Sequence, residues 1–512
     1  MFYHDAMNTP TTTFAPVDWA VLVGYMALMV AIGVVVSRRQ KDTDGFFLGG
    51  RQMPVWAVAL SVLATSLSAA TFIGVPQISY GGDLTYLILN LGGMIAAFVV
   101  AFLFVPPIYR AGTTTIYGYL GQRFGMVSST AASGMFLFGR LLASGARLYM
   151  AAIAFSLMLY GNIDTKSLFA AVVLLGAIGT LYTVFGGIRA VIWTDVVQIV
   201  VVALVAVLSI WLLLDAIPLS AGEIFSVLRD ADGVNKLMLV DTRVGWEYEY
   251  TLLTGLVAGT LVSTACYGVD HDLAQRMMTA KSAWHGGMAM VVSTFLGIPV
   301  VLLFMVIGLL LYIYYGRPDL MGDFAPLDLV DDTRKVYPQY LLSHLPAGLR
   351  GLSMAGLFAA AMSSFDSAIN AMASTAVADL YLPWRRARGH ADDGAILESR
   401  AAVALMGLAL TLFAALAVWL QSVDDTSLIG FALGVMAFAL APLLGVFSAA
   451  LFTLRGNNAS VLAALVAGVL VVLLLQPYML PAGLGFKLGW PWVWVAAAPV
   501  SFGVCVLGRS RP

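Results

Sequence analysis

The chain has 512 residues, of which 60% are hydrophobic and only 11% are charged, and its formal net charge at pH 7 is −1. The charged share is less than half of the roughly 25% typical of a soluble domain, which indicates a chain embedded in a membrane. The near-zero net charge gives no reason to expect a nucleic-acid partner. Cys266 and Cys505 both fall in apolar runs, so no disulfide framework is expected.

Apolar runs of about twenty residues recur along the whole chain, and each is long enough to cross a hydrocarbon core about 30 Å thick as a helix. They predict an all-α polytopic membrane protein with about 13 transmembrane helices and no soluble domain. Because the first 16 residues lack the basic segment of a cleaved signal peptide, the first run is expected to be retained. The predicted spans lie near 17–37, 54–80, 84–106, 128–159, 167–185, 190–216, 249–275, 286–315, 346–380, 398–420, 426–453, 459–476 and 489–508.

Basic residues in the loops indicate the orientation. With the N-terminus outside and the C-terminus in the cytoplasm, 16 of the 27 Lys and Arg residues fall in the short loops on the inner side. By the positive-inside rule this predicts a multi-pass protein of a bacterial-type inner (plasma) membrane with that orientation. The inner-side residues are Arg38, Arg39, Lys41, Arg51, Arg110, Arg123, Arg189, Arg276, Lys281, Arg385, Arg386, Arg388, Arg400, Arg455, Arg509 and Arg511.

The span at 54–80 contains a run of small and hydroxylated residues, Ala64–Thr71, followed by Gly74 and Pro76. Such a helix is easily interrupted, and backbone carbonyls freed at a break are good ligands for a hard cation. The alternative is that these small residues only allow tight helix packing.

The stretch FAAAMSSFDSAINAM carries polar residues at the centre of a span. Ala360, Ser363, Ser364 and Ser367 are spaced i, i+3, i+4 and i+7, so they share one helical face, and Asp366 borders it. Serines in a helix often bond only to the preceding turn, but a carboxylate at membrane depth is a candidate for a functional site. Oxygen ligands without His or Cys suit Na⁺ rather than a transition metal.

Two further segments carry acids. In GGIRAVIWTDVVQ, Asp195 lies about one turn into a span, where it is either a site residue or a capping acid at the interface. In CYGVDHDLAQRMMTAK, Asp270, His271 and Asp272 are expected near the cytoplasmic end of a span, where they would serve gating or anchor a loop.

Four segments, in order, resemble blocks of the sodium:solute symporter family: GGRQMPVWAVALSVLATSLSAATFIGVPQISY, YRAGTTTIYGYLGQRF, TLYTVFGGIRAVIWTDVVQ and GLFAAAMSSFDSAINAMASTAVADLY. The resemblance implies Na⁺-coupled secondary active symport on an inverted five-plus-five helix repeat of the leucine-transporter type. The repeats would be 54–216 and 249–453, with one extra helix at 17–37 and two at 459–508. The first helix of each repeat would be broken near the midplane, where solute and ion bind.

The resemblance also implies a principal Na⁺ site formed by the carbonyl groups of Ala64, Leu67 and Ala360 and the hydroxyl groups of Ser363 and Ser364. Five oxygens are a reasonable ligand set for one Na⁺ ion.

Some family members have a second Na⁺ site, which maps to Ser363, Ser367 and Asp195. Its remaining position is Asp366, where those members have a hydroxyl. A second Na⁺, a coupled H⁺ and a purely structural pair of acids are the alternatives, because two nearby carboxylates need a cation or a proton between them. A second cation is the preferred interpretation.

Substrate-facing positions of the family map to Ser66, Ser68, Thr71 and Asn90. The three hydroxyl groups are similar to those of bacterial sialic acid transporters. Sugar transporters carry Gln at the position of Thr71 and an acid at that of Asn90, so hexose transport is not expected.

The sialic acid transporters also place an Arg on the third core helix. Here Arg140 and Arg147 lie seven residues apart on one helical face, and gapless alignment places the family's Arg between them. Arg147 is preferred because it lies deeper in its span, and Arg140 is interpreted as a side chain that snorkels to the inner surface. Since a guanidinium can hold a carboxylate through two parallel bonds, the expected solute carries a carboxylate, with sialic acid first. A neutral sugar, amino acid or vitamin is the alternative.

Other functional classes fit less well. An enzyme would need convergent catalytic groups, and the five histidines are scattered along the chain. A transporter-like sensor would need a signalling domain after the last span, and a channel is the other alternative in that class. The expected partners are therefore a small solute, Na⁺ and the lipid bilayer, with no obligate protein partner. The histidines are His4, His271, His285, His344 and His390.

Overall fold

The computed structural model describes residues 14–37, 42–231, 233–322, 333–389, 396–421, 428–476 and 488–509. Within these ranges the chain is built from helices, so the predicted all-α class is confirmed. Arg38, Arg39, Lys41, Arg511, His4 and His390 lie outside the described residues.

The α-helices are α1 (Pro16–Ser37), α2 (Thr43–Leu48), α3 (Val55–Ser66), α4 (Ala69–Gly81), α5 (Ile88–Val99), α6 (Val105–Arg110), α7 (Ile116–Phe124), α8 (Met126–Tyr160), α9 (Thr165–Ala216), α10 (Ala221–Arg229), α11 (Thr260–Gly268), α12 (His271–Met278), α13 (Ala283–Gly316), α14 (Pro318–Met321), α15 (Val336–Ser343), α16 (Leu349–Thr375), α17 (Leu382–Ala387), α18 (Ile396–Gln421), α19 (Leu428–Phe452), α20 (Asn458–Leu474) and α21 (Trp490–Leu507). Short π-helical stretches at Val100–Phe104, Thr254–Gly259 and Ala376–Tyr381 join several of them into longer spans.

Eight helical segments in the described part of the chain are long and apolar enough to cross a membrane, and the bent pair α3–α4 adds a ninth. Every predicted span overlaps a helix, but the number of crossings stays a prediction. One reason is that α9 runs over 52 residues and covers two predicted spans. Its glycine at Gly187 has a positive φ of 53°, so α9 is kinked there and its halves can follow different directions.

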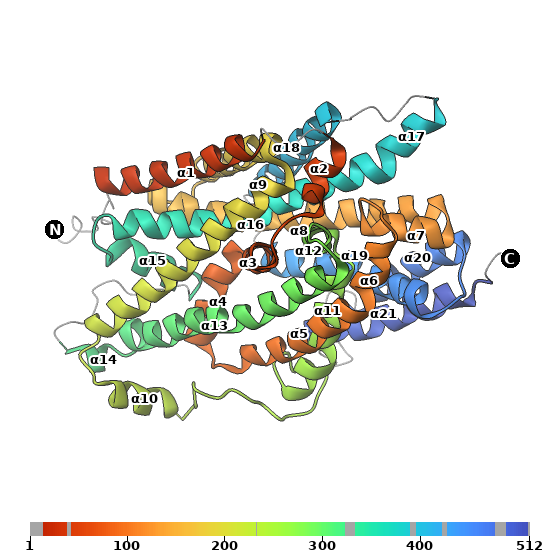
Figure 1. Ribbon diagram of the computed structural model, residues 1–512. Coiled ribbons are helices and arrows are strands. Elements are labelled where there is room, and N and C mark those ends of the chain that lie inside the picture. The colour runs from red at the N-terminus through yellow and green to blue at the C-terminus, as the bar shows by residue number, and fades with distance from the viewer. Residues whose placement is uncertain are drawn as a thin grey trace.

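Helix α16 lies at the centre of the bundle (Figure 1). It packs against α1, α3, α8, α9 and α18. In the most apolar stretch of this span 94% of the residues are buried, whereas in that of α1 only 22% are. Its sequence is rich in Ala, Ser and Gly, which lets neighbouring helices approach closely. The polar side chains of α16 are therefore shielded from lipid and can bond only to other protein groups, water or a bound ion.

Two spans are interrupted close to α16. Helices α3 and α4 meet at an angle of 60°, with Leu67 and Ser68 in extended conformation between them. Helix α11 ends before Val269, and α12 starts after Asp270, whose Oδ1 accepts a hydrogen bond from the N–H of Asp272 at 3.0 Å. The interruption predicted from the small residues between Ala64 and Thr71 is confirmed.

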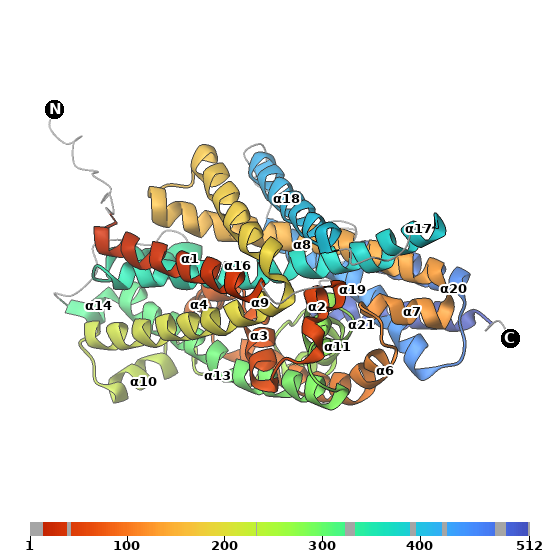
Figure 2. The same ribbon diagram turned by 45° about the horizontal axis from the view of Figure 1, so that its top comes forward.

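The two ends of the bundle differ. The start of α1 and helices α10 and α14 lie at one end, whereas α7, α17 and the end of α21 lie at the other, in both views (Figures 1 and 2). Arg123 and Arg385, two of the basic residues assigned to the inner side, belong to α7 and α17.

Helix α4 is held against α13 by a close contact. The hydroxyl of Ser79 donates to the carbonyl oxygen of Met305 at 2.8 Å. A Cβ atom added at Gly308 would overlap the carbonyl oxygen of Pro76 and the hydroxyl of Ser79. Glycine at position 308 thus allows the backbones of the two helices to touch.

We expect Gly308→Ala to lower the free energy of unfolding by about 1–3 kcal/mol, because α4 must move away from α13. Thermal unfolding of the purified protein in detergent measures this effect. Gly297→Ala on the same helix is the matched control, since its Cβ would lie 3.4 Å from Leu63, an ordinary contact distance. Equal melting temperatures for the two variants would contradict the close-contact interpretation.

Candidate functional site

Five oxygen-bearing groups predicted to bind Na⁺ converge where α16 passes the end of α3. The hydroxyl oxygen of Ser363 lies 2.9 Å from the carbonyl oxygen of Ala64, 3.4 Å from that of Leu67 and 3.2 Å from that of Ala360. The hydroxyl oxygen of Ser364 lies 3.5 Å from the carbonyl oxygen of Leu67. The structure therefore brings the whole predicted set together.

This cluster has more acceptors than donors. Besides the three predicted carbonyls, the carbonyl oxygen of Thr65 lies 3.3 Å from the hydroxyl of Ser364. Four carbonyl oxygens thus face two hydroxyl groups, which supply only two hydrogens. The carbonyls of Ala64, Thr65 and Leu67 are available because α3 ends there. An excess of buried oxygen lone pairs is the arrangement that a hard cation such as Na⁺ would complete.

The residues assigned to a second cation site make separate contacts. The hydroxyl of Ser367 donates to Asp272 at 2.8 Å, whereas the hydroxyl of Tyr182 donates to Asp366 at 2.7 Å. Asp195 accepts a hydrogen bond from Ser61 at 2.5 Å. Ser363 is bonded to the carbonyl oxygens of the principal site, and within the described residues no hydrogen bond joins these four side chains to one another.

Asp195 and Asp366 lie on α9 and α16, which pack against each other. Both side chains are fully buried, and Oδ1 of each makes no hydrogen bond within the described residues. An unpaired carboxylate oxygen in a buried position is costly unless a cation, a proton or water compensates it. Each of the two acids therefore has one oxygen left for a cation, a proton or a water molecule.

The location predicted for Arg276 is wrong. It was assigned to a basic loop on the inner side, but its side chain is completely buried. Its guanidinium contacts Asp195 at 3.2 Å and Asp272 at 3.0 Å, and its Nε donates to Ser61 at 2.9 Å. The i, i+4 spacing of Asp272 and Arg276 was the available sequence signal, since it predicts contact on one helical face.

The side chains predicted to face the solute lie around the break and on α5. The hydroxyl of Ser66 is bonded to the carbonyl of Val62 at 2.8 Å and is exposed, although its neighbours in sequence are buried. Ser68 caps α4 together with Thr71, whose hydroxyl accepts from the N–H of Ser68 at 3.4 Å. Asn90 donates to the carbonyl of Leu87 at 3.3 Å. These hydrogen bonds all go to nearby residues in the sequence, which leaves further hydrogen-bonding capacity for a ligand.

The two arginines of α8 differ sharply in their surroundings. Arg140 is only 6% exposed and contacts Asp270 at 2.8 Å and also Asp272. The interpretation of Arg140 as a snorkelling side chain is therefore wrong, because two buried acids hold it inside. Arg147 is half-buried and donates to the Sδ atom of Met436 at 3.0 Å, which is a weak acceptor.

Sequence and structure comparisons identify relatives over most of the chain. A model of the sodium:solute symporter family matches residues 46–468. The sodium/sialic acid symporter SiaT of Proteus mirabilis is 27% identical over 90% of this chain and 89% of its own length. The human sodium/iodide cotransporter is 28% identical over 89% of this chain and 69% of its own length.

Solved structures agree with this assignment. The substrate-bound outward-open state of a Na⁺-coupled sialic acid symporter superposes with a TM-score of 0.81 at 25% identity, covering 96% of this chain and 98% of that one. A nucleobase-cation-symport-1 family transporter shares the fold alone, with a TM-score of 0.56 at 15% identity and coverage of 90% and 92%. The resemblance drawn from the four sequence blocks is thereby confirmed, and the protein is a transporter, not an enzyme. The chain belongs to the sodium:solute symporter family, and its activity is Na⁺-coupled symport.

Proposed function

We propose that this protein imports a small solute carrying a carboxylate group, with sialic acid as the first candidate. The observation that carries the proposal is Arg147, a guanidinium at membrane depth whose hydrogen bond in the described residues goes to a thioether rather than to an acid. Charged groups at this depth need a partner, and a solute carboxylate would supply two parallel hydrogen bonds. Relatives named for sialic acid, iodide and monocarboxylates handle anions, which supports the same class.

The Na⁺ ion would bind between Ala64 and Leu67 of the interrupted span and Ala360, Ser363 and Ser364 of α16. It would join the two elements and favour the state that accepts solute. Each positive charge that moves inward also gains about 2.3 kcal/mol per 100 mV of membrane potential. Repeats at 54–216 and 249–453 would then rock about this site.

The orientation in the proposal has the N-terminus outside and the C-terminus in the cytoplasm, with thirteen spans crossing a bacterial-type inner membrane. Its support is that α7 and α17, the helices that carry Arg123 and Arg385, lie at the end of the bundle opposite to the start of α1 (Figure 1). The side of the bundle that carries α7 and α17 is called the inner side from here on.

The proposal includes a second cation between Asp195 and Asp366. Its support is the unbonded oxygen on each carboxylate and the packing of α9, which carries Asp195, against α16, which carries Asp366. A coupled proton and a purely structural acid pair are the competing roles. A neutral solute remains the alternative to a carboxylate, and a transporter-like sensor or channel is the alternative in another class.

Ser364→Ala removes one hydroxyl ligand from the principal Na⁺ site. We expect the Na⁺ concentration for half-maximal uptake to rise about tenfold, since one lost ligand is worth about 1–1.5 kcal/mol. Uptake into proteoliposomes at varied Na⁺ measures it. Ser353→Ala is the matched control, because Ser353 lies on the same helix, is buried, and within the described residues bonds only to the carbonyl of Leu349 at 2.9 Å. Unchanged Na⁺ activation in Ser364→Ala would remove this assignment.

Asp366→Ser restores the hydroxyl of the two-sodium pattern and removes one buried charge. We expect the ratio of Na⁺ to solute, or the pH dependence of uptake, to change. Counting ²²Na⁺ against labelled solute in proteoliposomes at several pH values distinguishes the roles. Tyr182→Phe is the control for the lost hydrogen bond alone. Wild-type stoichiometry together with a wild-type pH profile would leave Asp366 a structural residue.

Arg147→Gln should reduce uptake of a carboxylate solute at least a hundredfold, because a bidentate charged contact is lost. A Na⁺-dependent thermal-shift screen of the wild type against sialic acids, sugars, amino acids and small carboxylates first selects the solute. Uptake of that solute is then compared with uptake of its uncharged methyl ester or amide. If Arg147→Gln takes up the carboxylate as well as the wild type does, the solute is held elsewhere or is neutral.

A further inference from the structure

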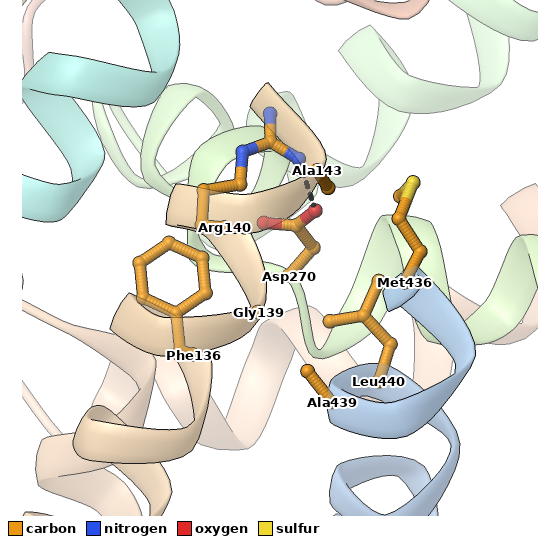
Figure 3. Close-up of a pocket in the computed structure, with 8 residues that line it drawn as sticks. All are labelled: Phe136, Gly139, Arg140, Ala143, Asp270, Met436, Ala439 and Leu440. Carbon is orange, nitrogen blue, oxygen red and sulfur yellow. Dashed lines mark hydrogen bonds and ion pairs between the residues drawn. The ribbon is translucent and has the colours of Figure 1, made fainter. Parts of the chain in front are cut away.

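Arg140 closes a small pocket between α8, α19 and the break that joins α11 to α12. The pocket is bordered by Arg140 and Asp270, which face each other at 2.8 Å, and by Met436 and Leu440 of α19 (Figure 3). The second amino group of Arg140 contacts the carboxylate of Asp272. Arg140, Asp270 and Asp272, named the inner latch from here on, therefore tie α8 to the start of α12.

The pocket connects the surroundings of the two arginines of α8. Arg140 and Arg147 are seven residues apart, which is two helical turns or about 10 Å along one face. Met436 contacts Arg147 through its sulfur and also borders the pocket beside Arg140. A solute that leaves Arg147 toward the inner side along this face of α8 would reach Arg140 next.

If the inner latch opened, its two acids would keep other partners, but its arginine would not. Asp272 keeps the guanidinium of Arg276 at 3.0 Å and the hydroxyl of Ser367 at 2.8 Å, and Asp270 keeps the N–H of Asp272. Within the described residues, Arg140 pairs with no other acid and its Nε makes no hydrogen bond. Opening the latch would therefore leave a buried cation uncompensated unless another anion replaced the two acids.

We propose that Arg140 is a second, transient binding site for the carboxylate of the solute. The solute anion competes with Asp270 and Asp272 for the guanidinium, and its arrival releases α12 from α8 so that the inner side opens. This inference rests on the proposed carboxylate solute. It assigns different roles to the two arginines: Arg147 holds the solute at the centre, and Arg140 receives it on the way out.

The affinity for solute on the inner side tests the competition. Right-side-out and inverted proteoliposomes give the half-saturating concentration of N-acetylneuraminic acid on each face. If the screen selects a small monocarboxylate, lactate and lactamide replace N-acetylneuraminic acid and its methyl ester. Arg140→Gln removes the second site, so the inner half-saturating concentration should rise about tenfold while the outer one stays near the wild-type value.

Asp270→Asn is the paired variant, since it removes one of the two competing carboxylates and leaves Arg140 in place. It should lower the inner half-saturating concentration, a shift opposite in direction to that of Arg140→Gln. A latch without solute contact predicts shifts in the same direction or none, and either result would overturn the proposal. Because the methyl ester lacks the charge, its inner half-saturating concentration should be the same in all three proteins.

The charge exchange Arg140→Asp with Asp270→Arg separates closure from solute binding. In a Cys505→Ser background, Cys266 is the remaining thiol of the chain, and it lies near the end of α11, four residues before Asp270. In this double variant, Cys266 should be labelled from the inner side at the wild-type rate, whereas transport of the anion should not recover. Recovery of both would make Arg140 a latch only.

Failure of the carboxylate proposal is distinguishable from failure of this inference. If the wild type does not prefer N-acetylneuraminic acid or lactate over the uncharged derivative on the outer face, the proposed function is wrong, and this site falls with it. If the outer preference holds and depends on Arg147, but neither latch variant changes the inner half-saturating concentration, only the second site is wrong.

Discussion

The buried guanidinium of Arg276 is the interaction on which the polar centre of this bundle depends. It joins α12 to α9 through Asp195, to α3 through Ser61, and to its own helix through Asp272. Removing it would leave the buried Asp195 without its cation and Asp272 with Arg140 alone, which is far more costly than losing a surface ion pair. These contacts fix where the end of α3 stands relative to α16, and so where the carbonyls of Ala64 and Leu67 meet the hydroxyls of Ser363 and Ser364.

The same network links the Na⁺ cluster to the inner side. Ser367 is one turn beyond Ser363 and Ser364 on α16, and its hydroxyl bonds to Asp272. Asp272 in turn contacts Arg276 and Arg140. A cation that draws α3 and α16 together therefore acts on α16, whose Ser367 bonds to Asp272. The same Asp272 contacts Arg140 and so helps to hold α8 to α12. This gives Na⁺ binding and inner closure a shared set of contacts, which is what coupled transport needs.

The two halves of the principal site could be predicted from local sequence features, whereas their pairing, which joins Ser363 to Ala64 across 299 residues, was implied by the resemblance to the family. The spacing of Ala360, Ser363, Ser364 and Ser367 places them on one face of any helix, and the run from Ala64 to Thr71 marks a break. Arg276 and Arg140 could not be placed in this way. The partners that bury Arg276 lie 81 and 215 residues away in sequence, and Asp270 lies 130 residues from Arg140. A basic residue near a predicted span end therefore looked like part of an inner loop until tertiary contacts were known. Gly187 is a similar case, since a single positive φ decides how the two halves of α9 are counted.

The central claim is that Na⁺ and a carboxylate solute bind cooperatively at neighbouring sites. Calorimetry of N-acetylneuraminic acid or lactate binding to the purified protein in NaCl and in KCl tests it most directly. We expect the solute to bind measurably only when Na⁺ is present. Saturating solute should also raise the affinity for Na⁺, by the same factor by which Na⁺ raises the affinity for the solute. Equal solute affinity in the two salts, or Na⁺ affinity that does not respond to the solute, would contradict it.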